Sequence, residues 1–288
     1  MMKAVSEVRP SPIAGKWYPS NPQLLASEVD RYIQKAQFPP LSGKIMAVMT
    51  PHAGYLYSGP VAGYAFAALR GMTPDLVAII SPMHHLSFEP LLTTAHAAYA
   101  TPLGNIPVDL EALNLLDGHL QEELGIKLSR IANDPEHSLE IELPFLQRAL
   151  ASPFRLLPIM VFEQSISIAR GLGQALARLF KENLADQSIL LVASTDLSHF
   201  YPQKIADILD KEFLRQVEAF DPEGVINIEK EGKGFACGRG ALAAVLWAAR
   251  EMGADHAQVL HHATSGDVTG DYSQVVGYAA AVITRRSG

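Results

Sequence analysis

Short apolar runs alternate along the chain with longer segments in which apolar residues recur at helical spacing. The runs are rich in β-branched residues and predict five strands: residues 45–49, 76–80, 156–161, 189–193 and 275–283. The second and fourth of these runs are apolar at every position, which is typical of strands covered by helices on both faces. The alternation therefore predicts an α/β fold with a central sheet, mostly parallel or mixed.

Helix signals mark the segments between these runs. Asn21 and Pro22, a capping residue and an early proline, precede an apolar stripe that predicts a helix reaching about Lys35. Further helices are predicted over residues 61–70 and 165–181, the first stopped by the glycine that follows it. The chain shows no internal repeat, low-complexity tract or linker, so we expect residues 1–288 to form a single domain.

Composition narrows the class of protein. Of the 288 residues, 48% are hydrophobic and 18% are charged, as in a globular protein with a substantial core. The formal net charge of -7 argues against nucleic acid as a partner, because phosphate backbones are bound mainly by clustered lysine and arginine. The N-terminal residues lack a signal-peptide apolar stretch, and the longest apolar runs fall far short of the ~20 residues needed to span a bilayer. We therefore expect a cytoplasmic protein that does not enter a membrane.

Three of the predicted strands run into histidine. The first is followed by His52, the second by His84 and the fourth by His199. Because ligands of open α/β sheets bind beyond the carboxyl ends of the strands, we expect these imidazoles to converge on one site. Five other histidines are interpreted as surface or hydrogen-bonded core residues: His96, His119, His256, His261 and His262.

Cys237 is the single cysteine, which excludes an intramolecular disulfide and fits a reducing compartment. It precedes an apolar helix predicted over residues 241–249, where the helix dipole and free amides would favour the thiolate. Two neutral imidazoles and a thiolate are good ligands for zinc, copper or iron(II), and a divalent ion held by them keeps about one unit of positive charge. The pattern therefore predicts a transition-metal site that attracts an anion or an ionised hydroxyl.

Other residues near the predicted strand ends are candidates for proton transfer and substrate binding. Asp196 lies three residues before His199, so it either orients that imidazole, which would then act as a base, or contacts substrate. His137 is expected at a helix start near the same edge of the sheet.

The tyrosines and glutamates near these segments have two interpretations each. Tyr55 and Tyr57 either donate hydrogen bonds to an oxyanion, as substrate-binding residues, or only pack. Glu140 and Glu142 follow a segment of helical period, and we interpret them as solvated helix charges.

Six motifs occur along the chain in the order RPSPIAGKWYPSNPQ, PHAGYLYSGPVAGYAF, SPMHH, EHSLEIELPFL, STDLSHF and ACGRGAL. Together they resemble the Memo-like proteins, whose prokaryotic members are called AmmeMemoRadiSam system protein B. The resemblance spans Arg9 to about Thr284. It implies a single-domain, three-layer α/β/α sandwich similar to the class III extradiol dioxygenases of the LigB type, with a nonheme metal at one end of the sheet.

The resemblance also implies a set of site residues, three facing the metal and three beside it: His52, His84 and Cys237, and His199, Asp196 and His137. His84 is implied rather than His85 because the family's motif uses the first histidine of the pair. The dioxygenases complete their site with two histidines and a carboxylate, whereas the third position here is a cysteine. Thiolate shifts the preference towards softer metals, notably copper, so dioxygenase activity does not follow from likeness of fold.

Three functions from different classes follow from these observations. The first is a metal-dependent oxidoreductase that uses iron(II) or copper, with His199 moving a proton. The second is a non-catalytic binding module that recognises a phosphorylated or acidic peptide with the same pocket. The third is a zinc hydrolase. The family name further implies a functional link to an AMMECR-type and a radical-SAM protein.

Overall fold

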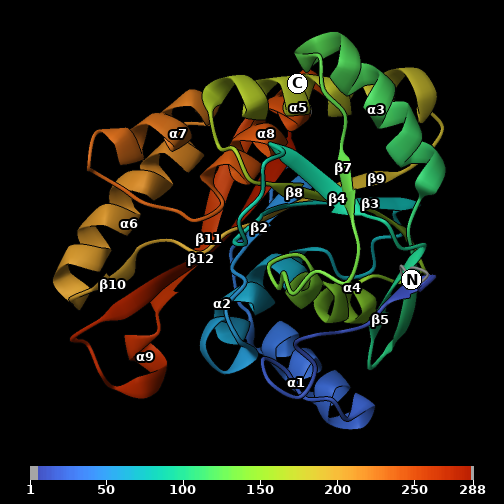
Figure 1. The fold of residues 1–288 in the computed structure, drawn as a ribbon. Helices are drawn as coiled ribbons and strands as arrows, with labels where there is room; N and C mark the ends of the chain where they lie inside the picture. Colours follow the sequence, from blue (N-terminus) through green and yellow to red (C-terminus); the bar gives the residue numbers. More distant parts are fainter. Residues whose placement is uncertain (1–5, 287–288) are drawn as a thin grey trace.

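The structure, a computed structural model, describes residues 6–286. Within that range nine strands form one mixed sheet, with helices on both of its faces (Figure 1). Four parallel strands, β2, β9, β3 and β8 in that spatial order, occupy its centre. Their bounds are Lys44–Thr50, Ile189–Ser194, Leu76–Pro82 and Arg155–Val161. The predicted α/β class and central mixed sheet are confirmed.

Shorter or antiparallel strands extend this centre on both sides. Next to β2 lies the antiparallel strand β12, which also pairs with β10 and β11, and next to β8 lies the antiparallel strand β4, which pairs with β7. A separate small sheet joins β1, β5 and β6. The bounds of these eight strands, in chain order, are Val8–Arg9, Leu91–Thr94, Ala98–Thr101, Gly104–Pro107, Ser129–Ile131, His199–Tyr201, His256–Thr264 and Val275–Arg285.

Helices cover the sheet in two layers, as Figure 1 shows. On one face of the sheet, helix α8 packs on the central strands, with α5 and α3 outside it. Helices α2, α4 and α1 cover the other face. Helix α6 packs beside β11, and α7 packs beside α8. The bounds of α1 to α9 are Pro22–Lys35, Tyr55–Ala68, Leu110–Leu124, Leu143–Ala149, Ile166–Arg178, Gln203–Glu218, Pro222–Lys230, Arg239–Glu251 and Gly266–Thr269. Among residues 6–286, no helix combines the length and the hydrophobicity that crossing a membrane requires.

The central strands are buried because helices pack on both faces of the sheet. Every side chain of β3 is buried, and one contiguous hydrophobic cluster of described residues includes both faces of the sheet. The five predicted strands and the first and third predicted helices are confirmed with ends that shift by a few residues. Ser165 caps α5, which continues through a π turn, Leu179–Asn183.

The second helix was predicted to start too late. Helix α2 begins at Tyr55 rather than at residue 61, and Pro60 lies inside it. The Gly59-Pro60 pair resembles a turn signal, but proline costs one backbone hydrogen bond here, and packing outweighs it. A Cβ at Gly59 would lie 2.5 Å from the ring of Tyr32, so the glycine permits the close contact between α2 and α1.

Replacing either of two glycines in the same helical layer by alanine should change the free energy of unfolding, with opposite signs at the two positions. A Cβ at Gly173 in α5 would lie 2.6 Å from the Cβ of Trp247 and 2.8 Å from the carbonyl oxygen of Ala244 in α8. We expect Gly173→Ala to lower the free energy of unfolding by about 1–3 kcal/mol through overpacking. Gly118 in α3 is exposed, and a Cβ added there would meet nothing within 4 Å. Gly118→Ala should therefore raise the free energy of unfolding by about 0.5–1 kcal/mol. Urea unfolding of both variants checks the pair, and an equal effect of the two substitutions would contradict the packing of α5 on α8.

Candidate metal centre

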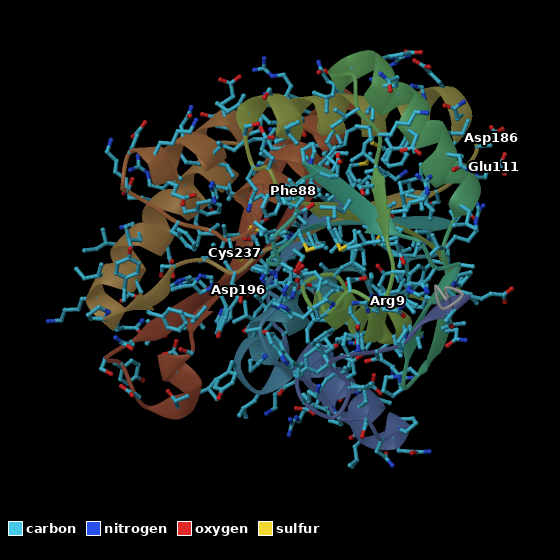
Figure 2. All side chains as sticks on the ribbon, in the orientation of Figure 1. Arg9, Phe88, Glu111, Asp186, Asp196 and Cys237 are labelled. Atoms are coloured by element: carbon cyan, nitrogen blue, oxygen red, sulfur yellow. The ribbon has the colours of Figure 1, made fainter. Side chains whose placement is uncertain are left out.

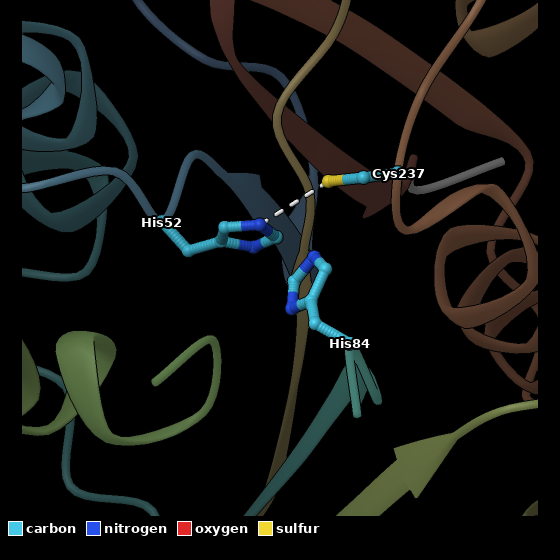
Figure 3. A group of neighbouring side chains, drawn as sticks. All are labelled: His52, His84 and Cys237. Carbon is cyan, nitrogen blue, oxygen red and sulfur yellow. Dashed lines mark hydrogen bonds between the residues drawn. The ribbon is translucent and has the colours of Figure 1, made fainter. Parts of the chain in front are cut away.

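Three loops bring nitrogen and sulfur ligands together at the carboxyl ends of the central strands. His52 follows β2, His84 follows β3, and Cys237 precedes α8. One ligand atom from each lies within 4.8 Å of the other two, and Cys237 Sγ lies 3.2 Å from His52 Nε2 (Figure 3). His52 and His84 therefore converge as predicted, together with Cys237, whereas His199, which was expected to converge with them, is not part of this group.

The loop that carries Cys237 is held against the end of β9. The Cys237 amide donates to the Asp196 carbonyl (3.2 Å), and the Gly238 amide donates to Thr195 Oγ1 (2.9 Å). A Cβ at Gly238 would lie 2.4 Å from the carbonyl oxygen of Ser194, so only glycine permits this approach. The sulfur therefore comes from a loop remote in sequence, and Figure 2 shows Cys237 and Asp196 close together in the molecule.

The spacing of the three donors fits a transition metal. With metal–nitrogen bonds of ~2.0–2.1 Å and metal–sulfur bonds of ~2.3 Å, a tetrahedral ion separates nitrogen and sulfur ligands by about 3.5 Å. The observed distance of 3.2 Å between His52 and Cys237, and the 4.8 Å limit for the whole set, require only small side-chain adjustments. Three protein donors leave further coordination positions for an exogenous ligand.

Buried groups fix the imidazole of His52. Ser194 Oγ donates to the Ser138 carbonyl (2.6 Å), so it accepts a hydrogen bond from His52 Nδ1 (2.8 Å). This arrangement leaves Nε2 without the ring proton and directed at Cys237. Burial, followed by the neighbouring imidazoles of His84 and His137, holds the pKa of His52 well below its usual value, so the ring stays neutral and able to bind a metal.

Glu136 fixes His84 in the same way. One carboxylate oxygen accepts from His84 Nδ1 (3.0 Å), and the other accepts from the His84 amide (2.6 Å). Burial opposes ionisation of this carboxyl, but the hydrogen bonds from His84 and from the Ser138 amide outweigh it and hold the pKa of Glu136 well below its ordinary range. An ionised acceptor leaves His84 Nε2 free for a metal. No role for Glu136 was predicted from the sequence.

The expectation that the Cys237 thiol ionises readily is wrong for the metal-free protein. The Asp196 amide, in the loop after β9, does donate to Sγ (3.3 Å). However, burial and the adjacent Asp196 carboxyl raise the pKa of the Cys237 thiol far above its usual value. A bound cation would therefore have to displace the thiol proton.

His137 lies beside two of the candidate ligands, His52 and His84, near the strand ends where it was predicted. Its ring stacks on that of His84, with centroids 4.9 Å apart and planes 14° apart, and Trp17 covers it at 4.1 Å. Burial is the main reason that the pKa of His137 falls to about 4, so the ring is neutral at pH 7. Trp17 belongs to the N-terminal segment and was not predicted to reach the site.

Asp196 contacts His52 rather than His199. Its Oδ1 accepts from the His52 amide (2.7 Å), and its Oδ2 lies 3.9 Å from His52 Nε2. Burial raises the pKa of Asp196 to about 7. His199 instead makes an edge contact with the ring of Phe235 (5.4 Å), and burial and His84 lower its pKa. Of the two roles predicted for Asp196, orienting His199 is therefore wrong.

Glu140 and Glu142 also differ from their predictions. The two glutamates have no exposed surface, and burial raises the pKa of both. Glu140 pairs with Arg9 at 2.6 Å, and Glu142 contacts Ser194 at 2.9 Å. These contacts replace the solvent that we expected around helix charges.

Of the two tyrosines, Tyr55 packs in the interior, in agreement with the second of its two interpretations. Tyr55 is 2% exposed and donates its hydroxyl to the Ile141 carbonyl (2.8 Å), so its oxygen is not free for substrate. Tyr57 is partly exposed on α2.

Three of the histidines set aside in the sequence analysis have ordinary structural surroundings. His96 is buried, with its two ring nitrogens within hydrogen-bond distance of main-chain atoms. His262 contacts the buried Asp210 (2.8 Å), and His261 stacks on Tyr64 with centroids 4.2 Å apart. Their interpretation as surface or core residues is confirmed.

Comparisons with known proteins identify proteins that are similar to this chain. The family model described as Memo-like protein matches residues 9–282. A MEMO1 family protein of Nitrosopumilus maritimus is 34% identical over 278 residues, covering 95% of this chain and 98% of the relative. One from Ignicoccus hospitalis is 36% identical over 286 residues, covering 95% and 97%. Among solved structures, the uncharacterized protein JW3007 from Escherichia coli K12 matches with a TM-score of 0.45 and 14% identity, over 83% of this chain and 100% of that chain.

Proposed function

The chain belongs to the family of Memo-like proteins, and on that basis we propose that it is a metal-dependent oxidoreductase with one metal centre formed by His52, His84 and Cys237. One observation carries the proposal: loops from three distant parts of the chain place two oriented imidazoles and the single thiol within 4.8 Å. Such a set suits iron(II) or copper, and open coordination positions suit a reacting ligand. Iron or copper held there would supply one-electron redox chemistry.

The surrounding residues have separate roles in this proposal. Ser194 and Glu136 keep the two imidazoles oriented, and the thiolate reduces the charge of a divalent ion to about +1, so the site attracts an anion or an ionised hydroxyl. Trp17 and His137 form one wall of the site and limit the access of water. His199, neutral at pH 7, is the proposed proton acceptor, and Asp196 is the proposed substrate contact or second proton carrier.

His199→Asn should separate proton transfer from metal binding. We expect the variant to keep one equivalent of metal, because His199 lies outside the ligand set, and to lose about 10²-fold in turnover, as removal of a general base does. Metal analysis and oxygen or superoxide consumption with an added reductant are measured on the same preparation. Loss of metal from this variant would reassign His199 as a ligand, and unchanged turnover would exclude it as the base.

Metal affinity should rise with pH. The Cys237 thiol must lose its proton to bind a cation, and its pKa is raised by burial, so the proton is still present at neutral pH in the metal-free protein. One proton released per ion corresponds to about tenfold tighter binding per pH unit between about pH 6 and 8. Competition titrations with a chromophoric chelator at several pH values measure the slope, and a flat profile would mean that the thiol is not a ligand.

Element-specific analysis of protein purified without oxygen tests the proposed function. Iron or copper near one equivalent, with oxygen or superoxide consumption that chelation abolishes, is the expected result. A zinc hydrolase is an alternative, because two imidazoles, one thiolate and an open position also suit a hydrolytic zinc ion. One equivalent of zinc without iron or copper would favour it. Binding of acidic or phosphorylated peptides that persists after chelation would instead favour a non-catalytic binding module.

A further inference from the structure

We propose that Arg9 is a positioning residue for the metal centre: it fixes the segment that carries Glu136, and Glu136 orients His84. The inference rests on the proposed function, because the imidazole that is positioned is one of the proposed metal ligands. It gives a role to the N-terminal motif, which lies more than a hundred positions from the segment that it contacts.

Arg9 is a buried cation bonded to one irregular segment at several points. Its side chain is 2% exposed. Nε and Nη2 donate to the two carboxylate oxygens of Asp134 (3.0 and 2.8 Å), and Nη2 also reaches the carbonyls of Asp134 (3.1 Å) and Glu136 (2.8 Å). Nη1 donates to Glu140 (2.6 Å). One planar guanidinium therefore joins three positions of the segment from 134 to 140.

The segment between 132 and 139 has no helix or strand of its own to hold it. Its buried main-chain groups need partners from elsewhere, and Arg9 supplies them for the carbonyls of Asp134 and Glu136. Asp134 is held by Arg9 and in turn accepts from the Glu136 amide (3.2 Å). The backbone of Glu136 is therefore fixed by Arg9 at its carbonyl and, through Asp134, at its amide.

From Glu136 the connection to the metal centre is direct. Its carboxylate accepts from the His84 amide (2.6 Å) and from His84 Nδ1 (3.0 Å), and both contacts depend on the placement of the Glu136 backbone. A displacement of about 1 Å would lengthen them beyond hydrogen-bond range. The His84 ring would then be free to rotate and to exchange its ring proton between Nδ1 and Nε2.

The N-terminal segment contacts the same region at two further points. Ser11 and Tyr18 both donate to Glu140 Oε1, the tyrosine at 2.8 Å, and the ring of Trp17 contacts that of His137 at a tilt of 37°. These contacts hold the N-terminal segment itself in place, so that Arg9 is presented at a fixed position. Arginine is required at this position because lysine carries its charge at one atom and cannot span the same acceptors.

Arg9→Lys tests the proposal, with Arg148→Lys as the matched control. Arg148 makes a two-point contact with Asp30 (2.8 and 2.7 Å) on the exposed side of α4, so the control loses an arginine–carboxylate pair without touching the site. The first readout is the His84 tautomer in the metal-free protein, followed by ¹H–¹⁵N NMR of the imidazole nitrogens. The second is the affinity for Co²⁺, followed by the sulfur-to-cobalt charge-transfer band.

In the wild type and in Arg148→Lys we expect His84 to carry its proton on Nδ1 alone. In Arg9→Lys we expect a mixture of tautomers and about tenfold weaker binding of Co²⁺, at the lower end of the range for loss of an outer partner of a metal ligand. A folded Arg9→Lys with an unchanged tautomer and unchanged affinity would overturn the proposal. If Arg9→Lys does not fold, Asp134→Asn carries the same test, because it weakens the contact with Arg9 and keeps the side-chain volume.

The two proposals fail in different ways. A wild type that binds no Co²⁺ would refute the metal centre, whereas the tautomer of His84 in the metal-free protein reports on Arg9 regardless of metal. A fall in melting temperature alone, with His84 unchanged, would assign to Arg9 a purely structural role and contradict its positioning role.

Discussion

Cys237→Ser will lose most of its affinity for a transition metal at neutral pH while it keeps its fold. A serine hydroxyl is nearly the same size as the thiol but does not ionise in this range, so the set of ligands falls to two imidazoles. Four-ligand zinc sites bind with about 10–16 kcal/mol, which is roughly 2.5–4 kcal/mol per ligand, so we expect a loss of about 10²–10³-fold in affinity.

Two measurements check this result. Elemental analysis after gel filtration gives the stoichiometry, and the sulfur-to-metal charge-transfer band, which needs the chain's single thiol, disappears in the variant. Met83→Leu is the control, since Met83 is a buried sulfur-containing residue next to His84 that has no place in the ligand set. Full metal content in Cys237→Ser, with Met83→Leu unaffected, would show that the thiol does not bind the ion.

Glu140→Gln will be among the most destabilising single substitutions outside the apolar core. Glu140 has no exposed surface and accepts from Arg9 (2.6 Å), Ser11 and Tyr18 (2.8 Å). Removing one partner of a buried ion pair typically costs about 3–5 kcal/mol, because the remaining charge stays buried. Asp134 still pairs with Arg9, so we expect about 3 kcal/mol, at the lower end of that range.

An exposed pair provides the matched comparison. Glu223 contacts Arg170 on the surface, where both side chains are nearly half exposed. Glu223→Gln should change the free energy of unfolding by less than about 1 kcal/mol, since solvent screens such pairs. Chemical unfolding of the two variants under identical conditions gives the difference. Equal and small effects would mean that Glu140 is not ionised and paired in the folded protein.

The α/β class, the central strands and the three candidate ligands could be predicted from the sequence because they depend on local patterns. Runs such as residues 76–80 and 189–193 are apolar at every position, and a strand of that kind has to be central. Once the strands are parallel, their carboxyl ends coincide, and the histidines that follow them must lie at one edge. Cys237 joined the set because it precedes a predicted apolar helix, and the resemblance to Memo-like proteins implied the same residue.

The carboxylates around the site were not predictable in this way. Glu140 and Glu142 follow a segment of helical period, where glutamate is usually solvated, and only their partners show otherwise. Those partners, Arg9 and Ser194, lie 131 and 52 positions away in the chain, so no local window contains both sides of either contact. Glu140 and Glu142 alternate with Leu139, Ile141 and Leu143, and these apolar neighbours indicated that the segment is buried.

Short edge strands were missed for a similar reason. Strands β4, β7 and β10 have three or four residues each, too few for a period to be recognised. Strand β11 contains three histidines and a glutamine, and it is stabilised by pairing with β12 over eight positions rather than by its own composition. Pairing of this kind is a property of the whole sheet.

X-ray absorption spectroscopy of the protein loaded with one equivalent of its native metal tests the central claim most directly. The account predicts two imidazole nitrogens at ~2.0–2.1 Å and one sulfur at ~2.3 Å, together with lighter atoms at the open positions. A spectrum with nitrogen and oxygen scatterers alone, and no sulfur, would contradict a metal centre formed by His52, His84 and Cys237.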